Sequence, residues 1–190
     1  GYDPRDFVLH SFGGTCGMLA SAFGRELAVR RIVIPYTASV NCAFGLVTAD
    51  VRHEYATTTT LPADASAEEV NAIFAPMTER AGRQLAAEGF SGNAVSMGWS
   101  VDLRYRRQVH EVTTPVRAPI PLDSEGLATL VADFEALYER KFGKGSAYRE
   151  AGIEMTMFRL TASGLIERPR LPREAEGPAQ ADGARIGRRP

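Results

Sequence analysis

One stretch of the chain, residues 95–105, restricts the fold more than any other, because its apolar residues recur at every second position. These are Val95, Met97, Trp99, Val101, Leu103 and Tyr105, and mostly small or polar residues separate them. Such alternation is typical of a β-strand with one buried face and one face in water. The sequence therefore predicts a half-buried antiparallel sheet with Trp99 on its buried face.

An amphipathic helix is expected to precede this strand and to cover its apolar face. Ser66 and Glu69 have the spacing of a capping box, in which each side chain bonds the other residue's backbone amide. Behind this box the apolar residues keep helical period to about Glu88. Pro76 lies inside the pattern and has no amide donor, so we expect it to kink or split the helix.

A second amphipathic helix and three more strands complete the predicted sheet layer. The helix is capped by Asp123 or Ser124 and leaves at Gly143, a residue type suited to a helix exit. Strands are expected over residues 55–61, 109–116 and 153–165, the first carrying four consecutive threonines. The apolar phase of the last strand switches near Met157-Phe158, which predicts a β-bulge there.

The first fifty residues have a different organisation. An apolar run at 7–12, glycines at 13, 14 and 17, a helical pattern and a second apolar run at 32–35 follow one another. Strand, glycine turn, helix and strand make a βαβ unit, so we expect buried strands paired in parallel. Residues 36–51 are interpreted as a loop that runs into a small-residue helix.

Composition and charge exclude several classes of protein. The 190 residues carry a formal net charge of -1, which argues against nucleic acid or an anionic membrane as the main partner. The local run Arg104-Tyr105-Arg106-Arg107 is interpreted as a solvated face. Cys16 and Cys42 belong to no CxxC pair, so no disulfide framework, zinc motif or other metal site is predicted. No signal peptide or membrane span is visible, so we expect a cytoplasmic protein.

Few residues carry a chemical signature. Gly13, Gly14 and Gly17 sit between a strand and a helix, where the backbone can approach a ligand closely and helix amides can face an anion or polar group, although a plain tight turn explains them too. The three histidines, His10, His53 and His110, are scattered and are assigned structural roles. The dense ionisable stretch 50–54 is assigned to bonding between segments. No catalytic residue is identified.

Several segments in one order resemble the C-terminal third of the hydantoinase A / 5-oxoprolinase / acetone carboxylase family. The resemblance rests on Gly1-Tyr2-Asp3-Pro4-Arg5-Asp6-Phe7, Ser11-Phe12-Gly13-Gly14, Arg25-Glu26-Leu27, Ala43-Phe44-Gly45-Leu46 with Ala49-Asp50-Val51-Arg52-His53, Asp102-Leu103-Arg104-Tyr105 with Gln108, Phe134 to Gly143, and Ile153 to Gly164. It covers roughly residues 1–170. One departure is that Thr15-Cys16-Gly17-Met18-Leu19 stands where the family commonly has Ala-Gly-Pro-Leu-His.

The resemblance implies an ATP-dependent enzyme with Mg²⁺ that phosphorylates an amide or enolate oxygen of a cyclic amide or ketone substrate. The activated species is then hydrolysed or carboxylated. In that family the glycine turn belongs to the lobe that contacts the adenosine of ATP. The phosphate-binding motif, the metal ligands and the catalytic acids would lie upstream or on a companion subunit. Because the chain opens at Gly1 with a core strand close behind, we expect it to be part of something longer.

The expected fold class is α+β: a βαβ remnant of an actin/hexokinase-like nucleotide-binding lobe, then an antiparallel sheet with two helices. Residues 1–55 would form the C-terminal part of the nucleotide-binding lobe, residues 56–170 the α+β domain and residues 171–190 a disordered tail. Two alternatives remain open. One is a non-catalytic assembly module whose sheet holds subunits together, and the other is an unrelated α/β nucleotide binder.

Overall fold

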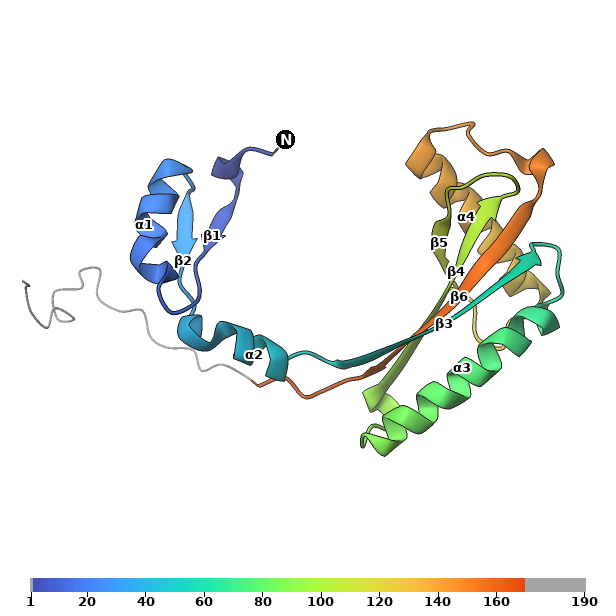
Figure 1. Cartoon of the computed structure of the whole chain (residues 1–190), viewed down its shortest axis with the longest axis horizontal. Helices are drawn as coiled ribbons and strands as arrows, with labels where there is room; N and C mark the ends of the chain where they lie inside the picture. Colours follow the sequence, from blue (N-terminus) through green and yellow to red (C-terminus); the bar gives the residue numbers. More distant parts are fainter. Residues whose placement is uncertain (1, 170–190) are drawn as a thin grey trace, which may run out of the picture.

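The computed structural model describes residues 2–169 and is divided between a small βαβ unit and a larger α+β layer structure (Figure 1). The chain order is β1 (Val8–His10), α1 (Cys16–Glu26), β2 (Arg31–Val33), α2 (Asn41–Val47), β3 (Val51–Pro62), α3 (Ala67–Ala87), β4 (Val95–Tyr105), β5 (Val112–Pro115), α4 (Ser124–Phe142) and β6 (Ile153–Gly164), with short 3-10 turns between some of them. Both the α+β class and the antiparallel sheet with two covering helices agree with the sequence. The predicted tail lies outside the described residues.

The βαβ unit pairs β1 with β2 in parallel, Val8 facing Arg31 and His10 facing Val33. Its strands are shorter than the apolar runs predicted, and they are not buried. Phe7 is 53% exposed and Phe12 46% exposed, which corrects the expectation of a covered core strand. The cause is that a pair of parallel strands with one helix leaves one face of the strands without a covering layer.

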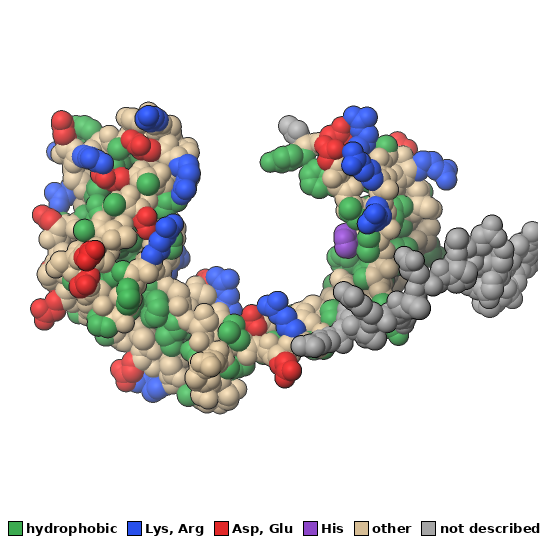
Figure 2. Space-filling view, turned by 180° about the vertical axis from the view of Figure 1, so that it is seen from behind, with side chains coloured by type: hydrophobic (Ala, Val, Ile, Leu, Met, Phe, Trp, Pro, Cys, Tyr) green, Lys and Arg blue, Asp and Glu red, His purple; other side chains and the backbone are tan. Residues whose placement is uncertain are grey.

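The helix of this unit packs through its small residues. Ala20 and Gly24 are its only buried residues, and a Cβ on Gly24 would lie 2.4 Å from Cδ1 of Ile32. The larger apolar side chains of α1 are instead exposed, among them Met18, Leu19 and Phe23. Figure 2 shows hydrophobic side chains at the surface of the βαβ unit, in the right arm of that view. This arm therefore presents apolar surface of the kind that marks an interaction site.

The four-stranded sheet has the order β3-β6-β4-β5, and every pairing is antiparallel. The helices α3 and α4 lie on one face of it (Figure 1). The bounds of β4 are those predicted from the alternation. The register of β6 shifts at Thr156, because Met155 and Met157 face Leu103 and Asp102, so the predicted bulge is present one residue before Met157.

The core lies between this sheet and the two helices. Its large, fully buried side chains come from both layers and include Phe74, Leu85, Leu103, Tyr105, Phe134, Phe158 and Leu160. Rings from the two layers meet edge to face, as do Phe74 and Phe158 with centroids 5.6 Å apart. Trp99 lies on the covered side but is only partly buried, and its indole Nε1 donates to Thr78 Oγ1 at 3.4 Å.

The helix starts follow the sequence closely. Ser66 caps α3 in a complete capping box with Glu69, and Asp123 caps α4 by accepting from the amide of Gly126 at 2.8 Å. The expectation of a split at Pro76 is wrong, because α3 is one helix of 21 residues with Pro76 inside it. Buried Phe74 and Met77 on either side of the proline hold the helix on the sheet.

The two parts of the molecule are joined by α2 and the start of β3 (Figure 1). At this junction the carboxylate of Asp50 accepts the backbone amide of Ile166 at 3.1 Å and lies 3.4 Å from Arg168 Nη2. Val51 pairs with Gly164, so β3 begins where β6 ends. The chain thus enters and leaves the sheet at one corner, where the bonds of Asp50 hold the start of β3 to the residues that follow β6.

Candidate functional site

The glycine turn between β1 and α1 is shaped for close approach by a ligand. Gly13 has φ 106°, a left-handed conformation that favours glycine, and its amide donates to Ala38 O at 2.7 Å. A Cβ at Gly13 or Gly14 would meet nothing within 4 Å, and one at Gly17 would only touch Ile34 at 3.9 Å. The glycines therefore leave open space beside the turn.

The start of α1 offers backbone donors to that space. Thr15 occupies the N-cap position without a side-chain capping bond, and the first turn of α1 holds no acidic residue. The amide of Met18 bonds Thr15 O at 3.1 Å, whereas the helix amides before it have no partner inside the helix and can donate to an anion or another polar group. Ser11, just before the turn, is 2% exposed and its Oγ has no hydrogen-bond partner among residues 2–169. The arrangement fits a polar ligand.

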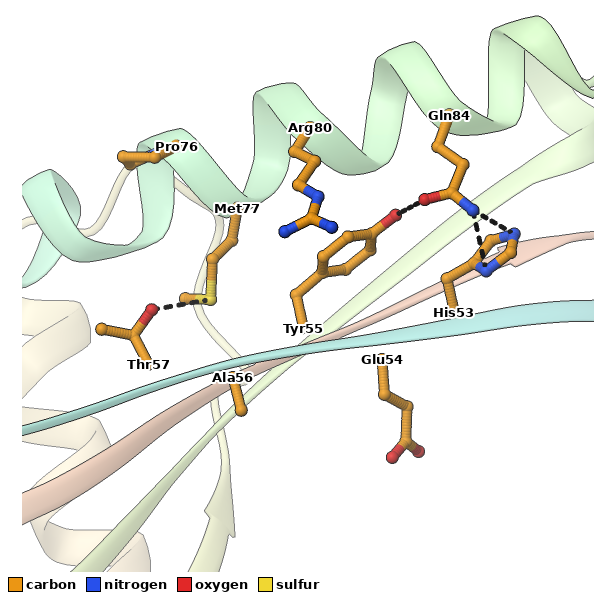
Figure 3. Close-up of a pocket in the computed structure, with 9 residues that line it drawn as sticks. All are labelled: His53, Glu54, Tyr55, Ala56, Thr57, Pro76, Met77, Arg80 and Gln84. Atoms are coloured by element: carbon orange, nitrogen blue, oxygen red, sulfur yellow. Dashed lines mark hydrogen bonds between the residues drawn. The ribbon is translucent and has the colours of Figure 1, made fainter.

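A second candidate is a groove between β3 and the side of α3, with a volume of about 460 Å³ (Figure 3). Three side chains from β3 and three from α3 face each other across it: His53, Tyr55 and Thr57 opposite Met77, Arg80 and Gln84. The Tyr55 hydroxyl donates to Gln84 Oε1 at 2.6 Å, and the Gln84 amide nitrogen lies 3.2 Å from His53 Nδ1. These bonds run from β3 to α3, so a fixed row of polar groups bridges the groove.

This row continues to a carboxylate at the end of α3. His53 Nε2 lies 2.8 Å from Glu88 Oε2, and this hydrogen bond holds the pKa of Glu88 below its ordinary value. Arg80 lies over the Tyr55 ring, 5.4 Å from its centroid, and makes no ion pair with any of the residues 2–169. The groove thus holds one arginine that has no counter-ion among the described residues, beside hydrogen-bonding groups.

The segment 102–105, which carries the resemblance in β4, divides between the two faces of the sheet. Leu103 and Tyr105 are fully buried under the helices. Asp102 faces the other side, where it lies 2.7 Å from Arg159 Nη2 and accepts from Thr113 Oγ1 at 2.6 Å. The Asp102 carboxylate raises the pKa of Arg159 above its ordinary value. These bonds tie β4 to both neighbouring strands, so the segment serves the architecture of the sheet.

Arg104 and Gln108 have structural partners too. Arg104 Nε lies 2.6 Å from Glu154 Oε1 and its Nη1 3.6 Å from Glu111 Oε1, which corrects the expectation of a solvated arginine at this position. The Oε1 atom of Gln108 accepts a hydrogen bond from the hydroxyl of Tyr138. Arg106 and Arg107 form no ion pair with a described residue.

The ionisable stretch 50–54 bonds between segments, as expected, through Asp50 to the chain after β6 and through His53 to α3. The glycine turn and the groove lie in different parts of the molecule, so the structure does not bring Gly13, Gly14 and Gly17 together with the ionisable stretch. Sequence reasoning missed the groove. Its signal is the spacing 77, 80 and 84 on one helix face, beside the alternation 53, 55 and 57.

Metal and membrane features are absent from the part of the chain described. Within residues 2–169 no group of three or more His, Cys, Asp or Glu side chains could hold a metal ion. Within the same range no helix combines the length and apolar character needed to cross a bilayer.

The sequence matches two parts of one family. Residues 1–55 match the family described as hydantoinase/oxoprolinase, and residues 58–190 match the hydantoinase/oxoprolinase C-terminal domain. The alpha subunit of caprolactamase from Pseudomonas jessenii is 32% identical over 190 residues, which is 97% of this chain and 26% of the relative. The chain therefore spans about a quarter of the length of this relative.

Two solved structures have the same fold. One is a nucleotide-free acetone carboxylase from work on ATP-dependent acetone carboxylation, with TM-score 0.84 and 22% identity over 93% of this chain and 26% of that chain. The other is the ATP-dependent caprolactamase from Pseudomonas jessenii, with TM-score 0.69 and 28% identity over 96% of this chain and 27% of that chain. Both the βαβ unit and the sheet domain fall within these alignments.

Proposed function

Because this chain belongs to the hydantoinase/oxoprolinase family, we propose that it is the C-terminal part of an ATP-dependent enzyme that hydrolyses a cyclic amide. The observation that carries this choice is the 32% identity to a caprolactamase subunit over 97% of the chain. A related ketone carboxylase is the second candidate, favoured by the TM-score of 0.84 to acetone carboxylase. ATP, when bound, supplies the phosphoryl group that activates the amide or enolate oxygen.

Gly13, Gly14 and Gly17 are the residues of this chain that we assign to nucleotide contact. The open space beside Gly13 and Gly14 and the uncapped start of α1 support the assignment. The contribution of these residues is to let backbone amides donate to the ligand at close range without a side chain in the way. In this proposal the three glycines bind and orient the nucleotide and take no part in proton transfer.

Mg²⁺, the phosphate-binding motif and the catalytic acids are then supplied by the rest of the enzyme. Support comes from the lack of a metal-binding cluster in residues 2–169 and from the share of the relative that the chain spans. Phosphoryl transfer depends on charge stabilisation around the whole transferred group. We therefore expect the 190-residue chain alone to have no ATPase and no amidase activity.

The partner is the remaining part of the same polypeptide or a companion subunit, and we assign the βαβ unit to that contact. Its parallel strands have an exposed face and α1 exposes Met18, Leu19 and Phe23. Parallel sheets normally have both faces covered, so this unit is complete only with further strands or helices on it. In this proposal residues 1–55 belong to the nucleotide-binding lobe, residues 56–170 form a separate domain, and the whole enzyme is cytoplasmic.

The experiment is an assay of ADP release by the complete enzyme that contains this chain, with Mg²⁺ and ATP present. Caprolactam, hydantoin and 5-oxoproline are compared with acetone plus bicarbonate. Stimulation by a cyclic amide supports the hydrolase, and stimulation only by the ketone with bicarbonate supports the carboxylase. ADP release that no amide or ketone changes, in an enzyme whose subunits come apart when this chain is removed, would favour an assembly module.

A matched pair of variants tests the glycine turn. Gly14→Asp adds a negative charge in open space and should raise the KM for ATP at least about tenfold, equivalent to about 1.4 kcal/mol. Gly45→Asp, also in open space but on α2, should leave that KM unchanged. Equal effects of the two substitutions would remove Gly14 from the nucleotide site.

A further inference from the structure

One edge of the sheet is unusually open to another strand. Within residues 2–169, the order β3-β6-β4-β5 leaves β3 and β5 each with one edge that no other strand pairs. The edge strand β5 has only four residues and ends in Pro115. The other edge strand, β3, has twelve residues, and from Tyr55 to Leu61 it carries no charge and no proline. A long, uncharged edge presents unpaired amides and carbonyls that a further strand can bond.

The groove described above runs along this same strand. Arg80 reaches from α3 towards β3, whereas Glu54 points to the opposite side of the strand (Figure 3). Arg83, on the same helix, is already paired with Glu79, so Arg80 is the cation of this stretch that lacks a described counter-ion. Its stacking on Tyr55, whose hydroxyl is held by Gln84, gives the guanidinium a fixed position.

We propose that an extended, acidic segment of a companion polypeptide adds to β3 as a fifth strand and places one carboxylate on Arg80. Alternate side chains of an added strand point to the helix side of the sheet, so one of them can reach the groove. Backbone bonds to β3 supply affinity that is independent of sequence. The Arg80–carboxylate bond supplies the specificity, because charge-assisted bonds are stronger than neutral ones.

The charges argue for a different polypeptide over a second copy of this chain. On β3 the residues that face α3 are His53, Tyr55, Thr57, Thr59 and Leu61, and none of them is acidic. Two copies paired through β3 would therefore bring no carboxylate from that strand to Arg80. A small free carboxylate would neutralise Arg80 but would leave the edge of β3 unpaired.

The test uses the full chain and a fluorescein-labelled peptide of about eight residues that alternates threonine and valine, with one central valine replaced by glutamate. Fluorescence anisotropy measures its Kd. The glutamate peptide should bind at least about tenfold more tightly than the same peptide with glutamine. Arg80→Gln should abolish this difference, while the neighbouring Arg83→Gln should preserve it. N-methylation of alternate backbone amides of the peptide should abolish binding.

Each alternative predicts a different result. No binding up to about 1 mM, or equal binding of the glutamate and glutamine peptides, would overturn the proposal. If the N-methylated peptide binds as well as its parent and free glutarate displaces it, the groove is a site for a small carboxylate. If sedimentation shows a dimer of the chain that the glutamate peptide cannot dissociate, the occupant of the edge is a second copy.

Discussion

Asp102 and Arg159 form an ion pair with 2.7 Å between carboxylate and guanidinium on the face of the sheet opposite the helices. The Asp102 side chain is only 5% exposed there, while that of Arg159 is 43% exposed. The carboxylate is therefore shielded by its own partners, Arg159 and Thr113, and not by a layer of structure. The two residues are 57 positions apart, so the pair joins β4 to β6 directly.

Removing the Arg159 guanidinium should lower the stability of the fold. We expect Arg159→Met to lower the free energy of unfolding by about 1–3 kcal/mol, because it leaves a buried carboxylate without its charged donor. A double-mutant cycle with Asp102→Asn, followed by urea unfolding, should give a coupling of at least about 1 kcal/mol. The exposed pair Arg52–Glu54, 62% and 66% exposed, should give less than about 1 kcal/mol. Equal couplings would contradict the structural role assigned to Asp102.

Replacing Tyr105 with the slightly smaller phenylalanine should stabilise the fold. Its hydroxyl is buried and has no hydrogen-bond partner in the described part of the chain, so Tyr105→Phe is expected to raise the free energy of unfolding by about 1 kcal/mol. Tyr138, which packs against the same ring, donates its hydroxyl to Gln108. Tyr138→Phe should therefore destabilise the domain by about 1 kcal/mol. Urea unfolding of the two variants side by side measures the difference in sign.

The same phenol sets a pH dependence at the alkaline end. Burial raises the pKa of Tyr105 above its ordinary value of 10.0, so the folded chain favours the neutral phenol. A group with a raised folded pKa gives stability that is complete below the unfolded pKa and is lost as the pH rises through the folded pKa. Melting temperatures of the chain should thus fall above pH 10 more steeply than those of Tyr105→Phe. Parallel curves would show that another group controls alkaline unfolding.

Gly164 at the end of β6 should tolerate no side chain. A Cβ there would lie 2.5 Å from the ring of Phe90, so Gly164→Ala should cost about 1–3 kcal/mol through overpacking. Gly98 lies in the neighbouring strand β4 with nothing within 4 Å of such an atom. Gly98→Ala should be neutral or stabilising by up to about 1 kcal/mol, because glycine weakens a strand. Thermal melts of the two variants separate steric conflict from strand propensity.

The exposed apolar face of α1 should make the isolated chain associate. Leu19 is 54% exposed and Phe23 is 53% exposed, so replacing both with serine should lower the weight-average mass seen by light scattering. Val109 is 85% exposed but stands in the other part of the molecule. Val109→Ser should leave the mass unchanged. A parent chain that is already monomeric at high concentration would contradict the interaction surface assigned to α1.

Local patterns predicted the elements well, because the physics that creates them is local. The alternation at 95–105 defines β4, and the capping residues Ser66 and Asp123 mark the starts of both long helices. The spacing at which apolar residues recur shows which side chains share a face of an element, but it does not show what covers that face. The helical pattern between residues 17 and 32, for example, corresponds to α1, but it does not show that Leu19 and Phe23 on this helix are exposed.

Long-range pairs could not be read from the sequence. Tyr55 and Gln84 are 29 positions apart, and His53 and Glu88 are 35 apart, so neither pair has a spacing that marks a site. Pro76 does not split α3, since its local penalty is outweighed by the packing of α3 on the sheet. Nucleotide contact stays a prediction for Gly13, Gly14 and Gly17. A glycine shows that a ligand has room to approach the backbone, but it does not identify the ligand.

The corner held by Asp50 has a consequence for how such proteins diversify. Because β3 starts beside the end of β6, the first and last described residues of the sheet domain lie close together at a single point. Domains whose ends lie close together can be inserted, lost or exchanged with little disturbance of the host. We therefore expect that the region from Asp50 to Arg168 can be moved into another protein as one folding unit. Grafting it between two residues of an unrelated carrier protein should return a folded sheet.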